Sequence, residues 1–265
     1  MILNTIASSS KKRVEEAKKK VSLEELKRRI YDGDKVRRFH NREDFAFEKA
    51  LKSRDISFIC EVKKASPSKG IIAKDFPYIA IAKDYEDAGA SAISVLTEPE
   101  YFQGSNIYLE EISKEVNIPV LRKDFTVNEY QIYEAKIMGA DAVLLICTLL
   151  DEEIIERYLK ICDELKLSAI VEAHTREEVL LALKSGARII GVNNRNLATF
   201  EVDIHNCIHL RKLVPEDILF IAESGIQTAE DIKELKSDKI DAVLIGETLM
   251  RSGNKKEMLR YLRGR

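Results

Sequence analysis

The sequence predicts an α/β protein in which eight parallel strands, each followed by a helix, close into a (β/α)8 TIM barrel behind an N-terminal helical extension. Two observations carry this prediction. Short apolar segments rich in β-branched residues recur roughly every 20–35 residues, and helical patterns separate them. The competing doubly wound sheet would have a glycine-rich GxGxxG turn after its first strand, and the sequence contains none.

The length fits either one large α/β domain or two small ones, and the composition is ordinary for a soluble globular protein. The chain has 265 residues, of which 45% are hydrophobic, and its formal net charge is −2. We expect a single domain over residues 1–265, with about residues 1–55 forming the helical extension. The small net charge argues against a general nucleic-acid-binding protein. For the assembly, we expect a monomer or a weak homodimer.

The first 55 residues carry helix signals and lack strand signals. Ser22 and Glu25 have the spacing of a capping box ahead of "LEELKRRI", and "REDFAFEKALKS" predicts a further amphipathic turn. In "KKRVEEAKKK", mixed charges at helical spacing predict a solvated helix face.

Several features predict a cytoplasmic protein. The basic cluster follows the mildly apolar "MILNTIASSS", the reverse of the order in a signal peptide. No segment approaches the ~18 consecutive apolar residues of a membrane span. The four cysteines lack CxxC spacing, which favours reduced thiols without a zinc site. His205 and His209 lie four residues apart, but without an evident third ligand they predict a surface helix.

The predicted strands lie after residue 55, and several helices before them end in glycine. In chain order the strands are "FICEVKKA", "AISVLTE", "VLRKDF", "AVLLIC", "AIVEAH", "IIGVNNR", "ILFIAES" and "AVLIGE". In "AGASAISVL", "MGADAVLLI" and "SGARIIGV", a glycine stands just past a predicted helix, where a left-handed residue often ends it.

Polar residues gather at the carboxyl ends of the predicted strands, where TIM barrels carry their chemistry. Glu61 and Lys63 end the first strand, two residues apart and therefore on the same face. Lys123 lies in "VLRKDF", and Glu172 stands between Val171 and Ala173 in the fifth strand. Because the carboxyl ends of all strands meet at one face of a TIM barrel, these charged side chains are expected to line one pocket.

Asn193 and Arg195, in phase in "VNNR", end the sixth strand. A lone charge near a strand end is usually a snorkelling side chain, and Asn-Asn alone is usually a turn. Five strands with polar groups at the same end favour a functional pocket, in which opposite charges offset the cost of burial. These groups would also shift one another's pKa, but the sequence does not give the direction of each shift. For Lys123, burial near other cations could bring the pKa toward neutrality.

Two further segments predict anion binding. Ser224-Gly225 and Gly246-Glu247 follow the seventh and eighth strands, where many TIM barrels bind phosphate through backbone amides. Ser66, in the turn after the first strand, could add a hydroxyl group.

Together the motifs "CEVKKASPSKG", "LRKDF", "VEAHTREE", "GVNNRNLATFEVD", "AESGI" and "VLIGETLM" resemble the indole-3-glycerol phosphate synthase family of tryptophan biosynthesis. The resemblance covers nearly the whole chain. It implies ring closure, decarboxylation and dehydration of 1-(2-carboxyphenylamino)-1-deoxyribulose 5-phosphate to indole-3-glycerol phosphate, with neither a metal nor an organic cofactor.

The resemblance also implies catalytic roles. Lys123 would be the general acid of ring closure, and Glu172 the general base of dehydration. Lys63 would bind the anthranilate carboxylate and donate a proton when hydroxide leaves. Glu61 would orient these groups.

Other residues would bind the substrate. Asn193 and Ser224 would hold it, Arg195 would support Glu172, and Glu223 is expected beside them. The resemblance implies a phosphate site made by Ser66, Gly225, Gly246 and Glu247. Phe125 and Leu197 are expected to form apolar walls for the aromatic ring.

Three other functions stay open at this point. A phosphoribosylanthranilate isomerase would need a Cys/Asp pair, but Cys60 is out of phase with Glu61 and is expected to face the helices. A Schiff-base aldolase could use Lys123 as its nucleophile. A non-catalytic barrel would bind a sugar phosphate without converting it.

Overall fold

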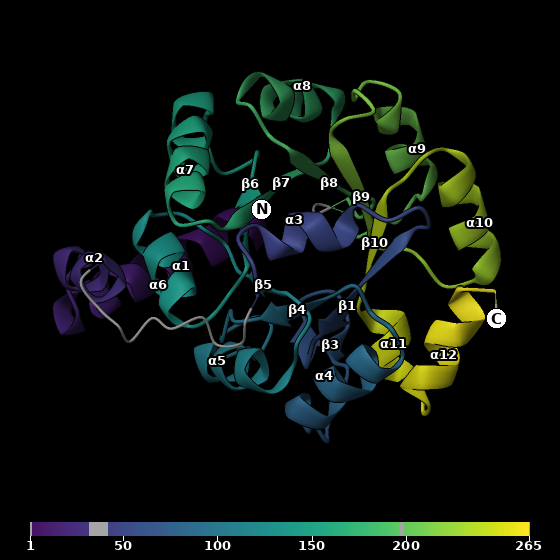
Figure 1. The fold of residues 1–265 in the computed structure, drawn as a ribbon, viewed down its shortest axis with the longest axis horizontal. Helices are drawn as coiled ribbons and strands as arrows, with labels where there is room; N and C mark the ends of the chain where they lie inside the picture. Colours follow the sequence, from purple (N-terminus) through teal and green to yellow (C-terminus); the bar gives the residue numbers. More distant parts are fainter. Residues whose placement is uncertain (1, 32–41, 197–198, 265) are drawn as a thin grey trace.

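The computed structural model describes residues 2–31, 42–196 and 199–264 and has a closed barrel of eight parallel strands (Figure 1). The strands are β1 (Ser57–Val62), β4 (Ala92–Leu96), β5 (Val120–Lys123), β6 (Ala142–Ile146), β7 (Ser168–Ala173), β8 (Ile189–Asn193), β9 (Leu219–Glu223) and β10 (Ala242–Ile245). All eight correspond to predicted strands. Pairing of β10 with β1 closes the barrel, which confirms the predicted fold class.

Helices precede the barrel and surround it. Among the described residues, three helices come before β1, namely α1 (Ile2–Lys20), α2 (Leu23–Tyr31) and α3 (Ala46–Leu51). Those that follow are α4 (Tyr78–Asp87), α5 (Asn106–Glu115), α6 (Tyr130–Ile137), α7 (Glu152–Glu164), α8 (Arg176–Lys184), α9 (His205–Arg211), α10 (Ala229–Ser237), α11 (Glu247–Arg251) and α12 (Lys255–Leu262). The helical extension is therefore present, and the glycines at the ends of α4, α6 and α8 have φ between 84° and 86° as predicted.

The first predicted strand is longer than the observed one. β1 ends at Val62, and a short hairpin of β2 (Ala65–Ser66) and β3 (Gly70–Ile71) follows it. The Pro-Ser-Lys-Gly turn between β2 and β3 carried no strand pattern, so the sequence did not predict this hairpin. Lys63 consequently stands in the loop above β1, where its long side chain reaches over the barrel mouth.

Alternating strand residues build two cores. Inward-facing side chains such as Ile59, Leu121 and Ile170 fill the barrel, and Phe47 and Leu51 of α3 pack among them. α3 also donates a backbone hydrogen bond to a side chain at the start of β7, so this helix closes the amino-terminal end of the barrel.

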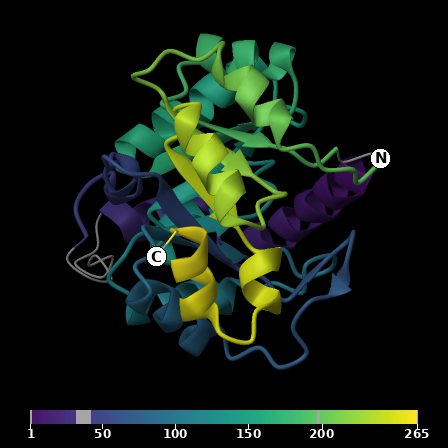
Figure 2. The same ribbon diagram turned by 90° about the vertical axis from the view of Figure 1, so that its right-hand side faces the viewer.

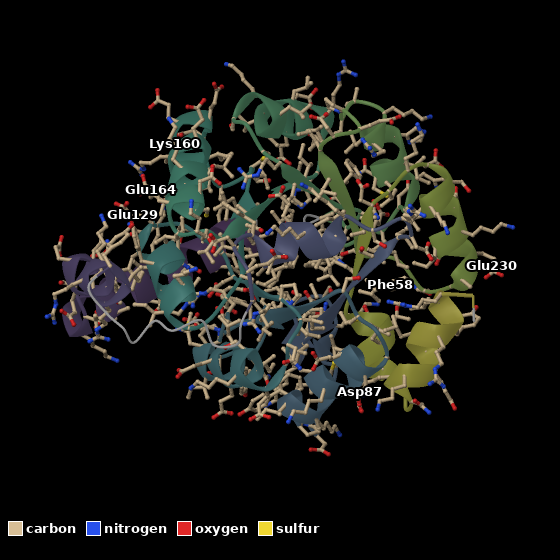
Figure 3. The ribbon with its side chains drawn as sticks, in the orientation of Figure 1. Phe58, Asp87, Glu129, Lys160, Glu164 and Glu230 are labelled. Carbon is tan, nitrogen blue, oxygen red and sulfur yellow. The ribbon has the colours of Figure 1, made fainter. Side chains whose placement is uncertain are left out.

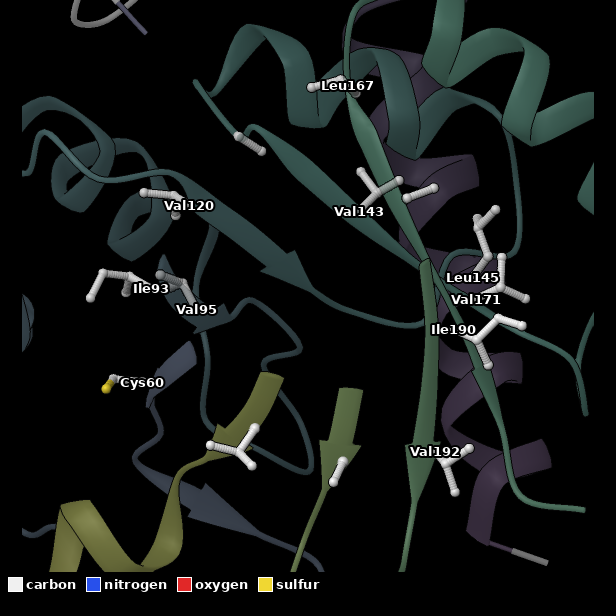
Figure 4. Close-up of a cluster of buried hydrophobic side chains, with 14 of the residues drawn as sticks. Cys60, Ile93, Val95, Val120, Val143, Leu145, Leu167, Val171, Ile190 and Val192 are labelled. Carbon is white, nitrogen blue, oxygen red and sulfur yellow. The ribbon is translucent and has the colours of Figure 1, made fainter. Parts of the chain in front are cut away.

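Outward-facing strand residues pack under the helices. Figure 4 shows this layer, which includes Cys60, Ile93, Val95, Val120, Val143, Leu145, Leu167, Val171, Ile190 and Val192. Cys60 belongs to it and is fully buried, which confirms that its thiol faces the helices.

α1 lies at the opposite end of the barrel from α3, as the turned view shows (Figure 2). Leu3 and Ile6 are buried on the side of α1 that faces the carboxyl ends of the strands. The position of Arg13 differs from the prediction of a solvated face, because it forms an ion pair with buried Asp124 at 3.1 Å. Charge patterning alone could not identify this distant partner.

The predicted capping box is half formed. The Ser22 hydroxyl accepts a hydrogen bond from the Glu25 N–H at 3.2 Å, which satisfies one free donor at the start of α2. The Glu25 carboxylate instead pairs with Arg28 and Arg29.

Charged side chains cover the outside of the barrel helices (Figure 3). Those labelled in the figure are Asp87, Glu129, Lys160, Glu164 and Glu230. Both His205 and His209 are exposed on α9, in agreement with a surface helix. Within the described ranges, every helix falls short of the length and apolarity that crossing a bilayer would demand.

Candidate active site

A cavity of about 760 Å³ opens at the carboxyl ends of the barrel strands. It brings together 13 of the predicted site residues, namely Glu61, Lys63, Ser66, Lys123, Phe125, Glu172, Asn193, Arg195, Glu223, Ser224, Gly225, Gly246 and Glu247. The remaining one, Leu197, lies outside the described residues.

Lys123 occupies the centre of a buried charge cluster. Its Nζ lies 2.8 Å from Oε2 of Glu172 and 2.7 Å from Oε2 of Glu223. Burial alone would lower the pKa of Lys123, but Glu172 and Glu223 outweigh this effect and raise the pKa above its usual value. The side chain is therefore a charged ammonium, surrounded by carboxylates rather than by the cations that would lower its pKa.

Glu172 and Glu223 both contact the Lys123 ammonium, but their pKa values shift in opposite directions. Burial raises the pKa of Glu223 to about 7, and the repulsion of Glu172 adds to the burial effect although Lys123 opposes it. Burial also disfavours the charged form of Glu172, but Lys123 and His174 outweigh it and lower the pKa of that carboxyl. A pair of carboxyl groups with separated pKa values is typical of acid–base sites.

Glu61 and Lys63 form a second ion pair beside the first, with 2.5 Å between Oε1 and Nζ. Ser94 lies 3.5 Å from the other Glu61 oxygen. Gly246 leaves room for this pair, because a Cβ at residue 246 would collide with the Glu61 carboxylate and lie 2.9 Å from Lys63 Nζ. The two charges thus compensate each other, which explains how β1 tolerates a buried carboxylate.

The loop after β8 holds Arg195 toward the rim. The Asn193 side chain accepts a hydrogen bond from the Arg195 N–H at 3.0 Å. The guanidinium of Arg195 reaches the Phe200 carbonyl at 3.2 Å and the Glu247 carboxylate at 3.8 Å. In the part of the chain that the structure describes, the Arg195 guanidinium contacts groups at the rim and not Glu172, so the expected support of Glu172 does not appear in this geometry.

Asn194 fixes the loop. Its amide donates to the Ser224 carbonyl at 3.2 Å and accepts from the Cys207 N–H at 3.0 Å. The sequence did not predict this role of Asn194, because both partners come from other segments of the chain.

The residues that follow β9 and β10 line the cavity. Ser224 and Gly225 have φ of 68° and 88°, two successive left-handed residues that turn the chain over the cavity. Gly246 caps α11. Lys69 and Arg251 approach the Glu247 carboxylate at 3.5 and 3.0 Å, so this side of the cavity has a cationic rim.

Apolar side chains cover the other side of the cavity. The ring centroids of Phe125 and Phe102 lie 6.0 Å apart. Ile2, Leu3 and Ile6 of α1 complete this wall. The sequence analysis missed the contribution of α1, although the helical spacing of these three apolar residues was a signal for it.

A further polar side chain lies beside Glu172. His174 Nε2 is 3.5 Å from Glu172 Oε1. We did not predict a role for this histidine, although its position two residues after Glu172 places it on the same side of the chain.

In residues 2–31, 42–196 and 199–264, no three His, Cys, Asp or Glu side chains are grouped as ligands for a metal ion. The cavity carboxylates Glu61, Glu172 and Glu223 each contact a lysine ammonium instead.

Solved structures of low sequence identity share the fold. 3-Hexulose-6-phosphate synthase from Salmonella typhimurium matches with a TM-score of 0.65 and 14% identity, covering 78% of this chain and 96% of that one. Thiamine phosphate pyrophosphorylase from Pyrococcus furiosus matches with a TM-score of 0.58 and 17% identity, covering 79% of this chain and 94% of that one.

Other proteins have a much higher sequence identity to this chain than these solved structures. The indole-3-glycerol phosphate synthase of Ruminiclostridium cellulolyticum is 59% identical over 264 residues, covering 100% of this chain and 99% of the relative. That of Lachnoclostridium phytofermentans is 54% identical over 268 residues, covering 99% of both. The family model described as indole-3-glycerol phosphate synthase matches residues 3–262. The chain therefore belongs to the indole-3-glycerol phosphate synthase family.

Proposed function

We propose that this protein converts 1-(2-carboxyphenylamino)-1-deoxyribulose 5-phosphate into indole-3-glycerol phosphate, carbon dioxide and water. The observation that carries the proposal is the placement of Lys123 against Glu172 and Glu223 on the floor of a cavity with one apolar side and one cationic rim. The substrate has the matching parts, namely an aromatic ring, a hydroxyl-bearing chain, a carboxylate and a phosphate. Membership in the family supports the same assignment.

Lys123 acts as the general acid of ring closure. Its ammonium is charged in the free protein, so it can attract the ribulose carbonyl oxygen and then transfer a proton to it. Lys63 binds the anthranilate carboxylate and donates a proton to the leaving hydroxide. Glu61 orients Lys63 through their ion pair.

Glu172 acts as the general base of the dehydration. Its lowered pKa keeps it ionised near neutral pH, ready to accept the proton whose loss restores aromaticity. Glu223, Asn193, Ser224 and Arg195 position the hydroxyl-bearing chain between the floor and the rim.

The phosphate binds at the cationic rim. Ser66 offers a hydroxyl, and Gly225, Gly246 and Glu247 offer backbone amides. The Glu247 carboxylate is itself held by Lys69 and Arg251, so its N–H is the relevant group. Phe125 packs against the aromatic ring.

We also propose that the protein works in the cytoplasm as a monomer or weak homodimer, without nucleic acid. Support comes from the net charge of −2 and from four buried cysteines with free thiols.

Incubation with the carboxyphenylamino-ribulose phosphate, followed by indole fluorescence, tests the activity. A borohydride trap run beside it addresses a Schiff-base aldolase, which would leave a reduced adduct on Lys123. A charged lysine is a poor nucleophile, so no adduct is expected.

A further inference from the structure

The two carboxylate oxygens of Glu172 face different groups. Oε2 accepts a hydrogen bond from Lys123 at 2.8 Å, whereas Oε1 lies 3.5 Å from Nε2 of His174. Among the described residues, that buried nitrogen has no hydrogen-bond partner that meets the usual geometry. A buried polar nitrogen without a hydrogen-bond partner costs free energy. Nε2 of His174 is therefore expected to interact with the Glu172 carboxylate toward which it points.

The opposite side of the imidazole ring is fixed by Glu178. Nδ1 of His174 lies 3.3 Å from Oε2 of Glu178, and the same oxygen accepts the His174 backbone N–H at 2.7 Å. The other Glu178 oxygen accepts from the Thr148 hydroxyl at 2.6 Å. Glu178 also stands in the first turn of α8, which Thr175 caps. The ring therefore has little freedom to turn away from Glu172.

A histidine between two carboxylates has a restricted protonation state. If Nδ1–H donates to Glu178, a neutral ring would present a lone pair on Nε2 to the Glu172 carboxylate, which is repulsive. Both contacts become favourable when the ring carries both protons. Burial lowers the pKa of His174, but Glu178 and Glu172 outweigh it and raise the pKa, in agreement with the geometry.

We propose that His174, held by Glu178, is a positioning residue of the reaction: its Nε2–H donates to Oε1 of Glu172 and keeps that base oriented and ionised. The inference rests on the proposed function, because it needs Glu172 to be the base. The motif "VEAHTREE" contains both residues, but the roles that the family resemblance implies include neither His174 nor Glu178.

The charges around Glu172 and His174 predict how replacing His174 changes the kcat–pH profile. Glu172 faces Lys123, Glu223 and His174, while the thiol of Cys147 beside Glu178 is neutral because burial raises its pKa to about 12. Loss of the imidazolium removes a positive charge next to Glu172 and so raises the pKa of the base. The acid limb of the kcat–pH profile should then move to higher pH.

Two substitutions of His174 separate the hydrogen bond that Nε2–H donates from the positive charge of the imidazolium. His174→Gln retains an N–H donor near the position of Nε2, whereas His174→Asn retains one near Nδ1. We expect His174→Asn to lower kcat by about 10- to 100-fold with KM changed less than about threefold, because the base loses its orientation. His174→Gln should keep most of the wild-type kcat, and both variants should show the shifted acid limb.

Glu178→Gln and a double-mutant cycle complete the kinetic test. Glu178→Gln should produce a smaller fall in kcat in the same direction. In a Glu172→Gln background, His174→Asn should have little further effect, because it acts through the missing carboxylate. If Glu172→Gln retains wild-type turnover, the assignment of the base in the proposed function fails. If Glu172→Gln is inactive but His174→Asn keeps a wild-type kcat and pH profile, only the present inference is overturned.

A titration by proton NMR tests the same contact without measuring activity. The chain has four histidines, and the spectrum of His174→Gln identifies the signal of His174. Its pKa in the wild type should exceed that of a free histidine and should fall in Glu172→Gln. A His174 signal that titrates identically in both proteins would overturn the inference, as would equal losses of kcat in the Asn and Gln variants without a shifted acid limb.

Discussion

Nζ of Lys123 lies 2.8 Å from Oε2 of Glu172, so the acid and the base of the proposed reaction form an ion pair in the free protein. Both side chains are almost completely buried. Glu223 contacts the same ammonium at 2.7 Å, so Lys123 has a second carboxyl partner when Glu172 accepts a proton. The charge cluster can thus exchange protons with the substrate without leaving an isolated buried charge.

Replacing Glu172 with Gln should preserve the shape of the site and remove the base. We expect kcat to fall by roughly 10²–10⁴ while substrate affinity changes little, because a carboxylate is not needed to bind an anion. Steady-state kinetics with the carboxyphenylamino-ribulose phosphate measure both quantities. Near wild-type turnover would mean that another group, with Glu61 the next candidate, is the base.

Lys123→Arg separates positive charge from proton donation. A guanidinium stays charged and is a very poor acid, with a pKa above ~12. We expect substrate binding within about tenfold of wild type and kcat lower by at least ~10². Lys123→Met, which has no charge, is the matched control for the larger planar Arg side chain. If Arg retains turnover and Met loses it, Lys123 acts only as a fixed charge and Lys63 becomes the acid.

Glu223 should make folding stability depend on pH. Its pKa of about 7 in the folded protein lies above the usual value of a glutamate, so between these values the folded state retains a proton that the unfolded chain has released. The free energy of unfolding therefore decreases as the pH rises through this window.

Glu223→Gln removes this dependence. The unfolding midpoint of the Gln variant relative to wild type should rise between about pH 5 and pH 7 and level off above it. Titratable groups that do not interact with Glu223 cancel in this difference. Thermal unfolding at several pH values measures it, and a difference that stays constant or shrinks over this range would refute the assigned shift.

Gly246→Ala should disturb the Glu61–Lys63 pair. The added Cβ would collide with the Glu61 carboxylate and would lie 2.9 Å from Lys63 Nζ, so both charged groups would have to shift. We expect kcat/KM to fall by about 10-fold or more, because small displacements of positioning groups are costly in catalysis. Gly253→Ala is the matched control, since its Cβ would meet no atom within 4 Å. Equal activity of the two variants would contradict this account.

The strands and most of the site could be predicted because their signals are local. β-Branched segments mark the strands, and a two-residue period places Glu61 and Lys63 on one face. The partner of each charge was not predictable, because it depends on which strand ends meet across the barrel. The raised pKa of Lys123 results from Glu172 and Glu223, which lie 49 and 100 residues away in the sequence.

The N-terminal helix illustrates the same limit. Its apolar residues Ile2, Leu3 and Ile6 show helical spacing, but only the folded chain places them over the barrel mouth. Likewise, the pairing of Arg13 with Asp124 spans 111 residues, so charge patterning in α1 gave no indication of it.

The most direct test of the account is turnover by protein that has been treated exhaustively with EDTA and mixed with 1-(2-carboxyphenylamino)-1-deoxyribulose 5-phosphate. The cavity carboxylates bind lysine ammonium groups, and the proposed proton transfers use side chains alone. We predict that indole fluorescence appears at the same rate as with untreated protein. Absence of fluorescence with both proteins, or activity that disappears with the chelator and returns with zinc or magnesium, would contradict the account.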